Sequence, residues 1–379
     1  MTRPANVALV SIFVLVISLP LAANLTGMDG ADPVAENREP AAFPTLDGTW
    51  RSLRDFPGGL DRWFEDHFGF RSDLVRWDAQ SRLFGFDTSP STAVLRGKDG
   101  WLFYADDGAT EDVAEAPTLD AGALRNWRTT ILAERDWLRS RGTAFVFLMA
   151  PDKHVIYPEE LPDEVTQAGP VSRTDQVLEA LADSGITLDL RPVLLEAKRQ
   201  ERIYHRTDTH WNDRGALVAY QSIIDAVRRQ APLVPPPWPR SDFDAVTRHT
   251  RGRDLAGMLG LTRVLSEEDL ALVPKRPRQA RVVEPPGASP TAEEGLLITE
   301  IPGSRFPKAV IVRDSFMTAV VPFLSEHFSR AVYVWQKDFD ATTVKEERPD
   351  VVIHEIVGRH LYNFIPSPEV VPPIDPQIR

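Results

Sequence analysis

Two short segments, far apart in the sequence, carry side chains that together could perform acyl transfer. The first is "RTDTHWND" (residues 206–213), in which Asp208 and His210 lie two positions apart. In an extended segment these side chains project to the same side, so the carboxylate could orient the imidazole and stabilise its protonated form. The second is "KAVIVRDSF" (308–316), in which Ser315 follows an apolar run. These three side chains could therefore supply a nucleophile, its base and the group that orients the base.

Each segment also has a simpler explanation. Asp208 could cap the helix that follows it, leaving His210 on the surface of a polar turn. His205, Asp208 and His210 could instead form an N/O ligand set for a metal ion. Ser315 could be a helix N-cap that accepts a hydrogen bond from a backbone N–H. Considered alone, the two segments leave the catalytic, capping and metal-binding interpretations open.

Chemistry at these positions requires elements that bring the segments together. Residues 123–142 predict an amphipathic helix ending at glycine, and 144–151 an apolar strand buried on both faces. Further strands are expected at 186–190, 309–312, 331–335 and 350–356, with helical patterns between them. This alternation predicts an α/β fold with a mainly parallel sheet and helices on both faces. Ser315 would then lie at the carboxyl ends of the strands, where the N–H groups of Ser315 and Phe316 could face developing negative charge.

Several other side chains near the predicted strand ends are candidates for substrate binding. Trp101 and Tyr104, after a hairpin turn, could stack on sugar rings or pack in the core. Lys153, after the strand at 144–151, could contact a sugar or carboxylate, or be solvated. Trp211 could shape an acceptor site or hold its loop. A structural ion pair is expected among Glu355, Arg359 and His360.

The N-terminus predicts association with a membrane. Arg3 precedes an apolar run from Val7 to Ala23, and the first charge after that run is Asp29. The length lies between a signal-peptide core and a spanning helix. Because no small-x-small cleavage motif follows, an uncleaved anchor is favoured over a removed signal. The residues beyond it are then expected on the far side of the membrane.

Composition excludes several classes of function. The chain has 379 residues, 42% of them hydrophobic, which is enough for a sizeable core. Its net charge of −12 argues against nucleic acid or an anionic membrane surface as the main partner. The absence of cysteine excludes disulfides, thiolate metal sites and cysteine nucleophiles.

The segment "YHRTDTHWNDRGALVAY" (204–220) strongly resembles the signature of the alginate O-acetyltransferase family of the AlgJ and AlgX type. Other similar stretches lie at 35–44, 63–71, 94–104, 150–162, 254–261 and 348–361. The resemblance implies an SGNH-hydrolase-like fold with a permuted order of catalytic blocks. It also implies that Asp208, His210 and Ser315 form the catalytic triad. No metal or cofactor is expected.

The resemblance leaves the oxyanion environment as a separate question. Arg313 stands where SGNH proteins usually have glycine, so it could crowd that site or bind an anionic substrate. Arg313 therefore joins Tyr104, Lys153 and Trp211 as a candidate substrate-binding residue. The expected organisation is an anchor or signal peptide at 1–25, a linker at 26–58, an acetyltransferase domain at 59–365 and a Pro-rich tail at 366–379.

The function implied by the resemblance is acetyl transfer to hydroxyls of an alginate-like exopolysaccharide, through an acetyl-serine intermediate. A membrane-bound O-acyltransferase partner would supply the acetyl group. The expected location is the periplasm, with the chain anchored in the inner membrane. Two alternatives stay open: an acetyl-esterase of the same fold, and a non-catalytic scaffold of a polysaccharide export complex.

Overall fold

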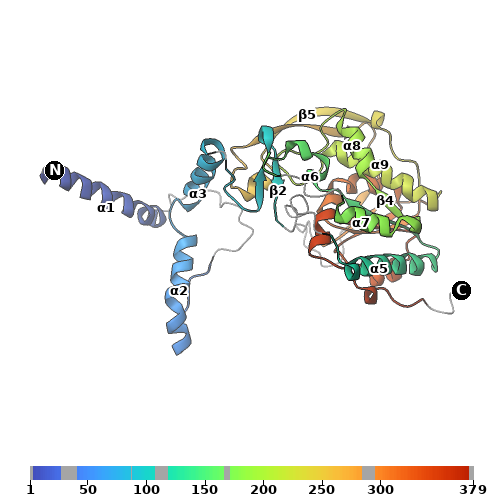
Figure 1. The fold of residues 1–379 in the computed structure, drawn as a ribbon, viewed down its shortest axis with the longest axis horizontal. Helices are drawn as coiled ribbons and strands as arrows, with labels where there is room; N and C mark the ends of the chain where they lie inside the picture. The colour runs from blue at the N-terminus through green and yellow to red at the C-terminus, as the bar shows by residue number, and fades with distance from the viewer. Residues whose placement is uncertain are drawn as a thin grey trace. The chain divides into compact units, whose positions relative to one another are not determined.

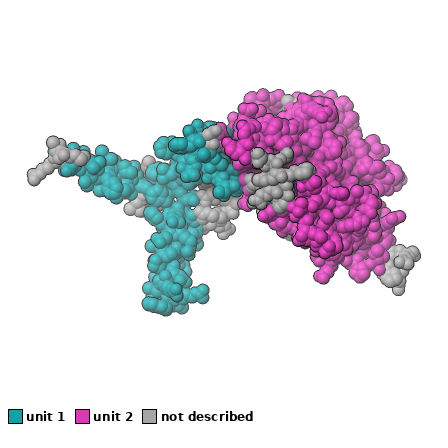
Figure 2. All heavy atoms as spheres, viewed as in Figure 1, with its two compact units in different colours: residues 1–94, 252–265 teal, residues 95–251, 266–379 magenta. Residues whose placement is uncertain are grey.

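The computed structural model describes residues 3–26, 41–86, 88–106, 118–165, 171–283 and 295–374. The chain divides into two compact units, coloured separately in Figure 2. Unit 1 comprises residues 1–94 and 252–265, and unit 2 comprises residues 95–251 and 266–379. Residues 27–40 of the expected linker and residues 375–379 of the expected tail lie outside the described residues.

Unit 1 is helical where it is described. Its elements are α1 (Arg3–Thr26), α2 (Trp50–Asp66), α3 (Arg71–Gln80), the π-helical turn η1 (Ser81–Gly85) and α10 (Asp254–Met258). Helix α1 contains the apolar run, and large side chains from Val7 to Leu19 are exposed on it. Across the described residues, no helix combines the length and apolar character required to cross a membrane.

Helix α2 corrects the expected linker. Residues 50–58 belong to the expected linker and end in Pro57 and Gly58, but they form the first half of this helix. The Thr49 hydroxyl accepts the Ser52 N–H at 3.2 Å and caps the first turn. Apolar side chains recur at helical spacing through the segment, which outweighs its Pro-Gly-Gly sequence.

Unit 2 is built around a seven-stranded sheet with the order β4-β3-β11-β9-β10-β8-β7. The strands are β3 (Ala144–Ala150), β4 (Thr187–Asp189), β7 (Arg281–Val283), β8 (Leu296–Glu300), β9 (Lys308–Arg313), β10 (Arg330–Trp335) and β11 (Val351–Val357). The five strands from β4 to β10 pair in parallel, whereas β8 and β7 add in antiparallel orientation. The predicted α/β fold with a mainly parallel sheet is confirmed, with an antiparallel edge.

Helices cover both faces of this sheet, as Figure 1 shows. The α-helices of unit 2 are α5 (Ala121–Arg139), α6 (Lys153–Ile156), α7 (Arg173–Ala180), α8 (Arg191–Lys198), α9 (Asp213–Gln230), α11 (Val321–Leu324) and α12 (Ala341–Glu347). Alternate residues of each strand enter two cores. One core contains α8, α9 and α11, and the other contains α5, α7 and α12. Each central strand is therefore buried on both faces.

The remaining elements are short or lie beside the main sheet. Two antiparallel pairs are formed by β1 (Val94–Arg96) with β2 (Leu102–Tyr104), and by β5 (Phe243–Arg251) with β6 (Ser266–Pro274). The 3₁₀ turns are η2 (Lys98–Gly100), η3 (Pro158–Glu160), η4 (Ala182–Ser184), η5 (Arg240–Asp242), η6 (Ser315–Ala319), η7 (Ser325–His327), η8 (Gly358–Tyr362) and η9 (Pro368–Val370). The expected hairpin around Asp99 is confirmed. The described part of the region 240–305, for which the sequence predicted no strand, contains four strands.

Candidate active site

Three of the predicted site residues form a hydrogen-bonded chain at the carboxyl end of the sheet. His210 Nδ1 lies 2.7 Å from Asp208 Oδ1, and His210 Nε2 lies 2.8 Å from Ser315 Oγ. The His210 N–H donates to the same Asp208 oxygen at 3.0 Å. The imidazole is therefore fixed between the carboxylate and the hydroxyl. In this arrangement it can accept the serine proton at Nε2 while Nδ1–H donates to Asp208.

The carboxylate of Asp208 is suited to this position. Its burial works to raise its pKa, but the hydrogen bond and charge of His210, together with the charge of His205, lower the pKa well below its usual value. Asp208 therefore stays ionised at neutral pH. An ionised carboxylate at Nδ1 favours the protonated imidazole that forms when Nε2 takes a proton.

The segment that carries Asp208 and His210 is a closed loop whose ends pair with each other. Tyr204 and Trp211 form an antiparallel bridge, and the Asn212 N–H donates to the Ile203 carbonyl at 3.0 Å. Asn212 then caps α9, because its Oδ1 accepts the N–H groups of Arg214 and Gly215. The cap of α9 is thus Asn212, and the alternative that gave this role to Asp208 is wrong.

Gly215 allows the loop to lie directly against the start of α9. A Cβ atom at this position would come within 2.3 Å of the Ile203 carbonyl oxygen and 2.8 Å of Trp211 Cβ. Any larger residue would push the helix away from the loop. The run from Ile203 to Gly215 therefore behaves as one preformed element.

Ser315 is the first residue of η6 and follows Asp314, which comes directly after β9; residues 313–316 form the serine turn. Asp314, rather than Ser315, caps this turn, since its Oδ1 accepts the Phe316 N–H at 2.9 Å. The capping alternative for Ser315 is wrong. The Phe316 N–H was expected to face developing negative charge, but it is committed to Asp314. Of that predicted pair of donors, the Ser315 N–H remains, as the first amide of the helical turn.

Lys153 follows β3 as expected, but it does not face solvent. Its side chain is 3% exposed, and its ammonium donates to the carbonyl oxygens of His205, Arg206 and Asp208 at 3.1, 3.2 and 2.6 Å. The ammonium contacts the loop that carries Asp208 and His210 and compensates the partial negative charge of these three carbonyl oxygens. Both predicted roles, substrate contact and a solvated lysine, are wrong because the ammonium is used inside the protein.

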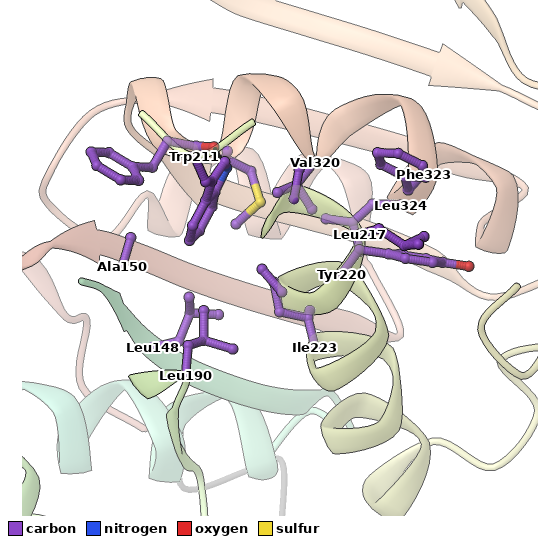
Figure 3. Close-up of a cluster of buried hydrophobic side chains, with 14 of the residues drawn as sticks. Leu148, Ala150, Leu190, Trp211, Leu217, Tyr220, Ile223, Val320, Phe323 and Leu324 are labelled. Carbon is purple, nitrogen blue, oxygen red and sulfur yellow. Dashed lines mark hydrogen bonds between the residues drawn. The ribbon is translucent and has the colours of Figure 1, made fainter. Parts of the chain in front are cut away.

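Trp211 and Arg313 are also buried, which corrects their assignment to substrate binding. Trp211 is 1% exposed, and its Nε1–H donates to the Phe316 carbonyl at 3.0 Å. Figure 3 shows Trp211 within the core, together with Leu148 of β3 and Tyr220 of α9. Arg313 lies over the Trp335 ring, 4.6 Å from its centre. Trp211 therefore ties the loop to the serine turn, and Arg313 packs against β10.

Tyr104 is the one candidate for substrate binding that is partly exposed. The Arg359 guanidinium lies 5.2 Å from the Tyr104 ring centre and 5.5 Å from that of Phe316. Tyr104 therefore lies near the serine turn, and its contact with substrate stays a prediction. Trp101, by contrast, is buried against Tyr157, as core packing requires.

His205, Asp208 and His210 are not arranged as the ligand set that the metal-binding alternative requires. His205 Nδ1 lies 3.2 Å from Asp269 Oδ2 and 3.6 Å from Glu267 Oε1. Both ring nitrogens of His210 are engaged by Asp208 and Ser315. His205 therefore faces a separate acidic pair rather than sharing ligands with His210.

Two aspartates at strand ends have roles that the sequence did not indicate. Asp152 accepts a hydrogen bond from Arg359 Nη1 at 2.7 Å, and Asp314 Oδ2 lies 3.5 Å from His360 Nδ1. The ion pair expected among Glu355, Arg359 and His360 is therefore wrong in its partners. The position of these aspartates in the sequence could have indicated their roles, because each of them follows a buried strand within two residues.

Comparison with known proteins identifies relatives of this chain. The family model described as "SGNH hydrolase-like domain, acetyltransferase AlgX" matches residues 94–356. A protein named "Probable alginate O-acetylase AlgJ" from Pseudomonas syringae pv. tomato is 28% identical over 235 residues, which are 62% of this chain and 55% of that protein. Its namesake from Pseudomonas aeruginosa is 27% identical over 267 residues, 68% of this chain and 65% of that protein. The chain thus spans less than two thirds of these relatives' length.

A solved structure gives an independent comparison of the fold. PatB1 from Bacillus cereus superimposes with a TM-score of 0.53 at 14% identity, over 72% of this chain and 98% of PatB1. At this identity the match concerns the fold alone.

Proposed function

Because this chain belongs to the family of SGNH hydrolase-like acetyltransferase domains of the AlgX type, we propose that it transfers acetyl groups to hydroxyls of an exopolysaccharide. The transfer would proceed through an acetyl-serine intermediate on Ser315. The observation that carries this proposal is the hydrogen-bonded chain from Asp208 through His210 to Ser315. The names of the AlgJ relatives support an alginate-like acceptor.

The first half of the reaction acylates the serine. His210 Nε2 takes the Ser315 hydroxyl proton as Oγ attacks the acetyl carbonyl carbon of the donor. The bond between that carbon and the donor's oxygen breaks, and the proton on His210 passes to the leaving group. Asp208 stabilises the imidazolium that exists between these two proton transfers.

The second half returns the enzyme to its starting state. A sugar hydroxyl gives its proton to His210 Nε2 and attacks the acetyl carbon of acetyl-Ser315. The ester bond to Ser315 Oγ breaks, and Oγ recovers a proton from His210. Hydrolysis would follow the same steps with water in place of the sugar. Binding of the acceptor therefore decides between transferase and esterase.

The chain is further proposed to act outside the cytoplasm, in the periplasm, held at the inner membrane by α1. The exposed apolar side chains from Val7 to Leu19 support this placement. The acetyl donor would come from a membrane-bound O-acyltransferase partner. If α1 is an anchor, the full chain stays with the membrane fraction after a high-salt wash; release by salt alone would contradict anchoring.

The test of the proposed function is direct detection of the intermediate. The full chain is treated with an activated acetyl ester and digested, and mass spectrometry locates the acetyl group. We expect one acetyl group on the peptide containing Ser315, and its loss on addition of an accepting oligosaccharide. Ser315→Ala should show no adduct, and Ser304→Ala, a serine in the β8–β9 connection, should retain it.

Two outcomes would redirect the proposal. Release of free acetate with no transfer to any oligosaccharide would identify an acetyl-esterase. Unchanged acetylation of the polymer in cells that carry Ser315→Ala would remove Ser315 from the mechanism and favour a scaffold without chemistry.

A further inference from the structure

Two buried carboxyl groups lie together beneath the serine turn. Asp314 immediately precedes Ser315, and Glu355 lies on β11, 1% exposed. The Asp314 N–H donates to Glu355 Oε2 at 3.0 Å. A side chain from β11 therefore holds the backbone at the residue before Ser315.

Asp314 uses both of its oxygens to hold the same region. Its Oδ1 accepts the Phe316 N–H at 2.9 Å, and its Oδ2 accepts the Val357 N–H at 2.7 Å. The turn after β9 is thereby joined to the end of β11. Both Asp314 oxygens therefore accept backbone N–H groups, which fixes this side chain between the turn and β11.

Glu355 is suited to the neutral form. Burial, followed by the charge of Asp314, raises its pKa well above its usual value. Other charged or titratable groups nearby are Arg313, whose charge opposes this rise, and Arg359 and His360, which face Asp314 from η8. Two carboxylates this close in a buried site cannot both ionise at low cost.

We propose that Glu355 is a positioning residue that acts as an uncharged acid, accepting the Asp314 N–H so that Ser315 Oγ is held at His210 Nε2. This inference rests on the proposed role of Ser315 as the nucleophile. Ionisation of Glu355 at alkaline pH would place a second negative charge beside Asp314 and loosen the turn. The rate of acylation should therefore fall as the pH rises above neutral. The cause would be Glu355 rather than a member of the Asp208–His210–Ser315 chain.

The test compares Glu355→Gln and Glu355→Ala with the unaltered chain. The rate at which Ser315 is acetylated by an activated ester is measured from neutral to alkaline pH. Glu355→Gln keeps an uncharged acceptor for the Asp314 N–H, so it should match the unaltered chain at neutral pH and lose the alkaline fall. Glu355→Ala removes the acceptor and should slow acylation about tenfold to a hundredfold at every pH.

Glu134→Gln is the matched control. Glu134 is also a buried carboxyl, but it lies on α5 at the opposite face of the sheet and bonds His354, the residue before Glu355, at 2.9 Å. Its replacement should lower the thermal midpoint and leave the pH profile of acylation unchanged. The control separates loss of stability from loss of positioning.

A readout without catalysis keeps this inference distinct from the proposed function. In protein labelled with ¹³C at glutamate carboxyls, the resonance absent from Glu355→Gln reports the protonation of Glu355. We expect the neutral acid at neutral pH. If Ser315 is never acylated, the proposed function fails while this resonance still decides the charge of Glu355. An ionised Glu355 at neutral pH, or an unchanged alkaline fall in Glu355→Gln, would overturn the inference.

Discussion

At the scale of single residues, Asp208 is the group whose chemistry can be altered with the least change of shape. Asp208→Asn keeps the size of the side chain but replaces the charged acceptor at His210 Nδ1. An amide there favours the wrong tautomer and does not stabilise the imidazolium. We expect acylation of Ser315 to slow by about 10⁴-fold, with a small change in thermal midpoint.

The measurement is the rate of ester cleavage under single-turnover conditions. Asp225→Asn is the matched control, because Asp225 is exposed on α9. A rate for Asp208→Asn equal to that of the control would show that His210 does not depend on this carboxylate.

The sequence predicted which side chains form the hydrogen-bonded chain better than it predicted where the neighbouring side chains lie. Asp208, His210 and Ser315 were found from residue type and from the strand end, and the structure brings them together. Lys153, Trp211 and Arg313 occur in the same segments but are buried. A lysine or tryptophan beside a site can bind substrate or support the loop, and only the packing of distant elements distinguishes these roles.

At the scale of elements, the contact between the 203–212 loop and the serine turn sets the geometry of the site. Trp211→Phe removes the Nε1–H that donates to the Phe316 carbonyl but keeps most of the buried ring. That carbonyl would lose a buried partner, which costs about 1–3 kcal/mol of stability. We also expect acylation to slow about tenfold, because the loop is no longer tied to the turn.

Trp238→Phe provides the comparison for this prediction. Trp238 is buried in the same core, and its ring packs beside Phe243 rather than the serine turn. Denaturant unfolding and single-turnover acylation are measured on both variants. If Trp238→Phe slows acylation as much as Trp211→Phe, the effect comes from the core in general and not from this contact.

Elements whose sequence shows an apolar pattern typical of burial were predictable, and elements that lack such a pattern were not. Strands β3, β9 and β11 are nearly continuous apolar runs and were expected. Strand β5 was missed because most of its residues are exposed and polar, so no alternation marks it. The first half of helix α2 was missed because Pro57 and the glycines that follow it are typical of a turn.

At the scale of the whole molecule, two buried histidines give the stability opposite dependences on pH. His327 accepts from Tyr220 Oη at Nε2 (2.6 Å) and donates from Nδ1 to the Pro235 carbonyl (3.1 Å). Burial lowers its pKa from 6.5 to about 4. His354 also loses solvation by burial, but the charge and hydrogen bond of Glu134 raise its pKa above 6.5.

The direction of each pH dependence follows from which state of the chain, folded or unfolded, binds the proton more tightly. Between pH 6.5 and about 4 the unfolded chain protonates His327 before the folded chain does, so the stabilisation present above pH 6.5 is lost as pH falls. The shift corresponds to about 3 kcal/mol. For His354 the folded chain holds the proton more tightly, so its stabilisation is complete below pH 6.5 and is lost as pH rises through the folded pKa.

The pH ranges in which the two histidines change the free energy of unfolding lie on opposite sides of pH 6.5. Their effects can therefore be distinguished in one series of measurements. The free energy of unfolding is measured by denaturant titration from pH 4 to 8 for the unaltered chain, His327→Gln and His354→Gln. His327→Gln should flatten the slope below pH 6.5 only, and His354→Gln the slope above it only. Each variant thus controls for the other, since both remove a buried imidazole from the same unit. An unchanged acid slope in His327→Gln would mean that other groups protonate first and that its neutral hydrogen bonds do not set the acid limit of the fold.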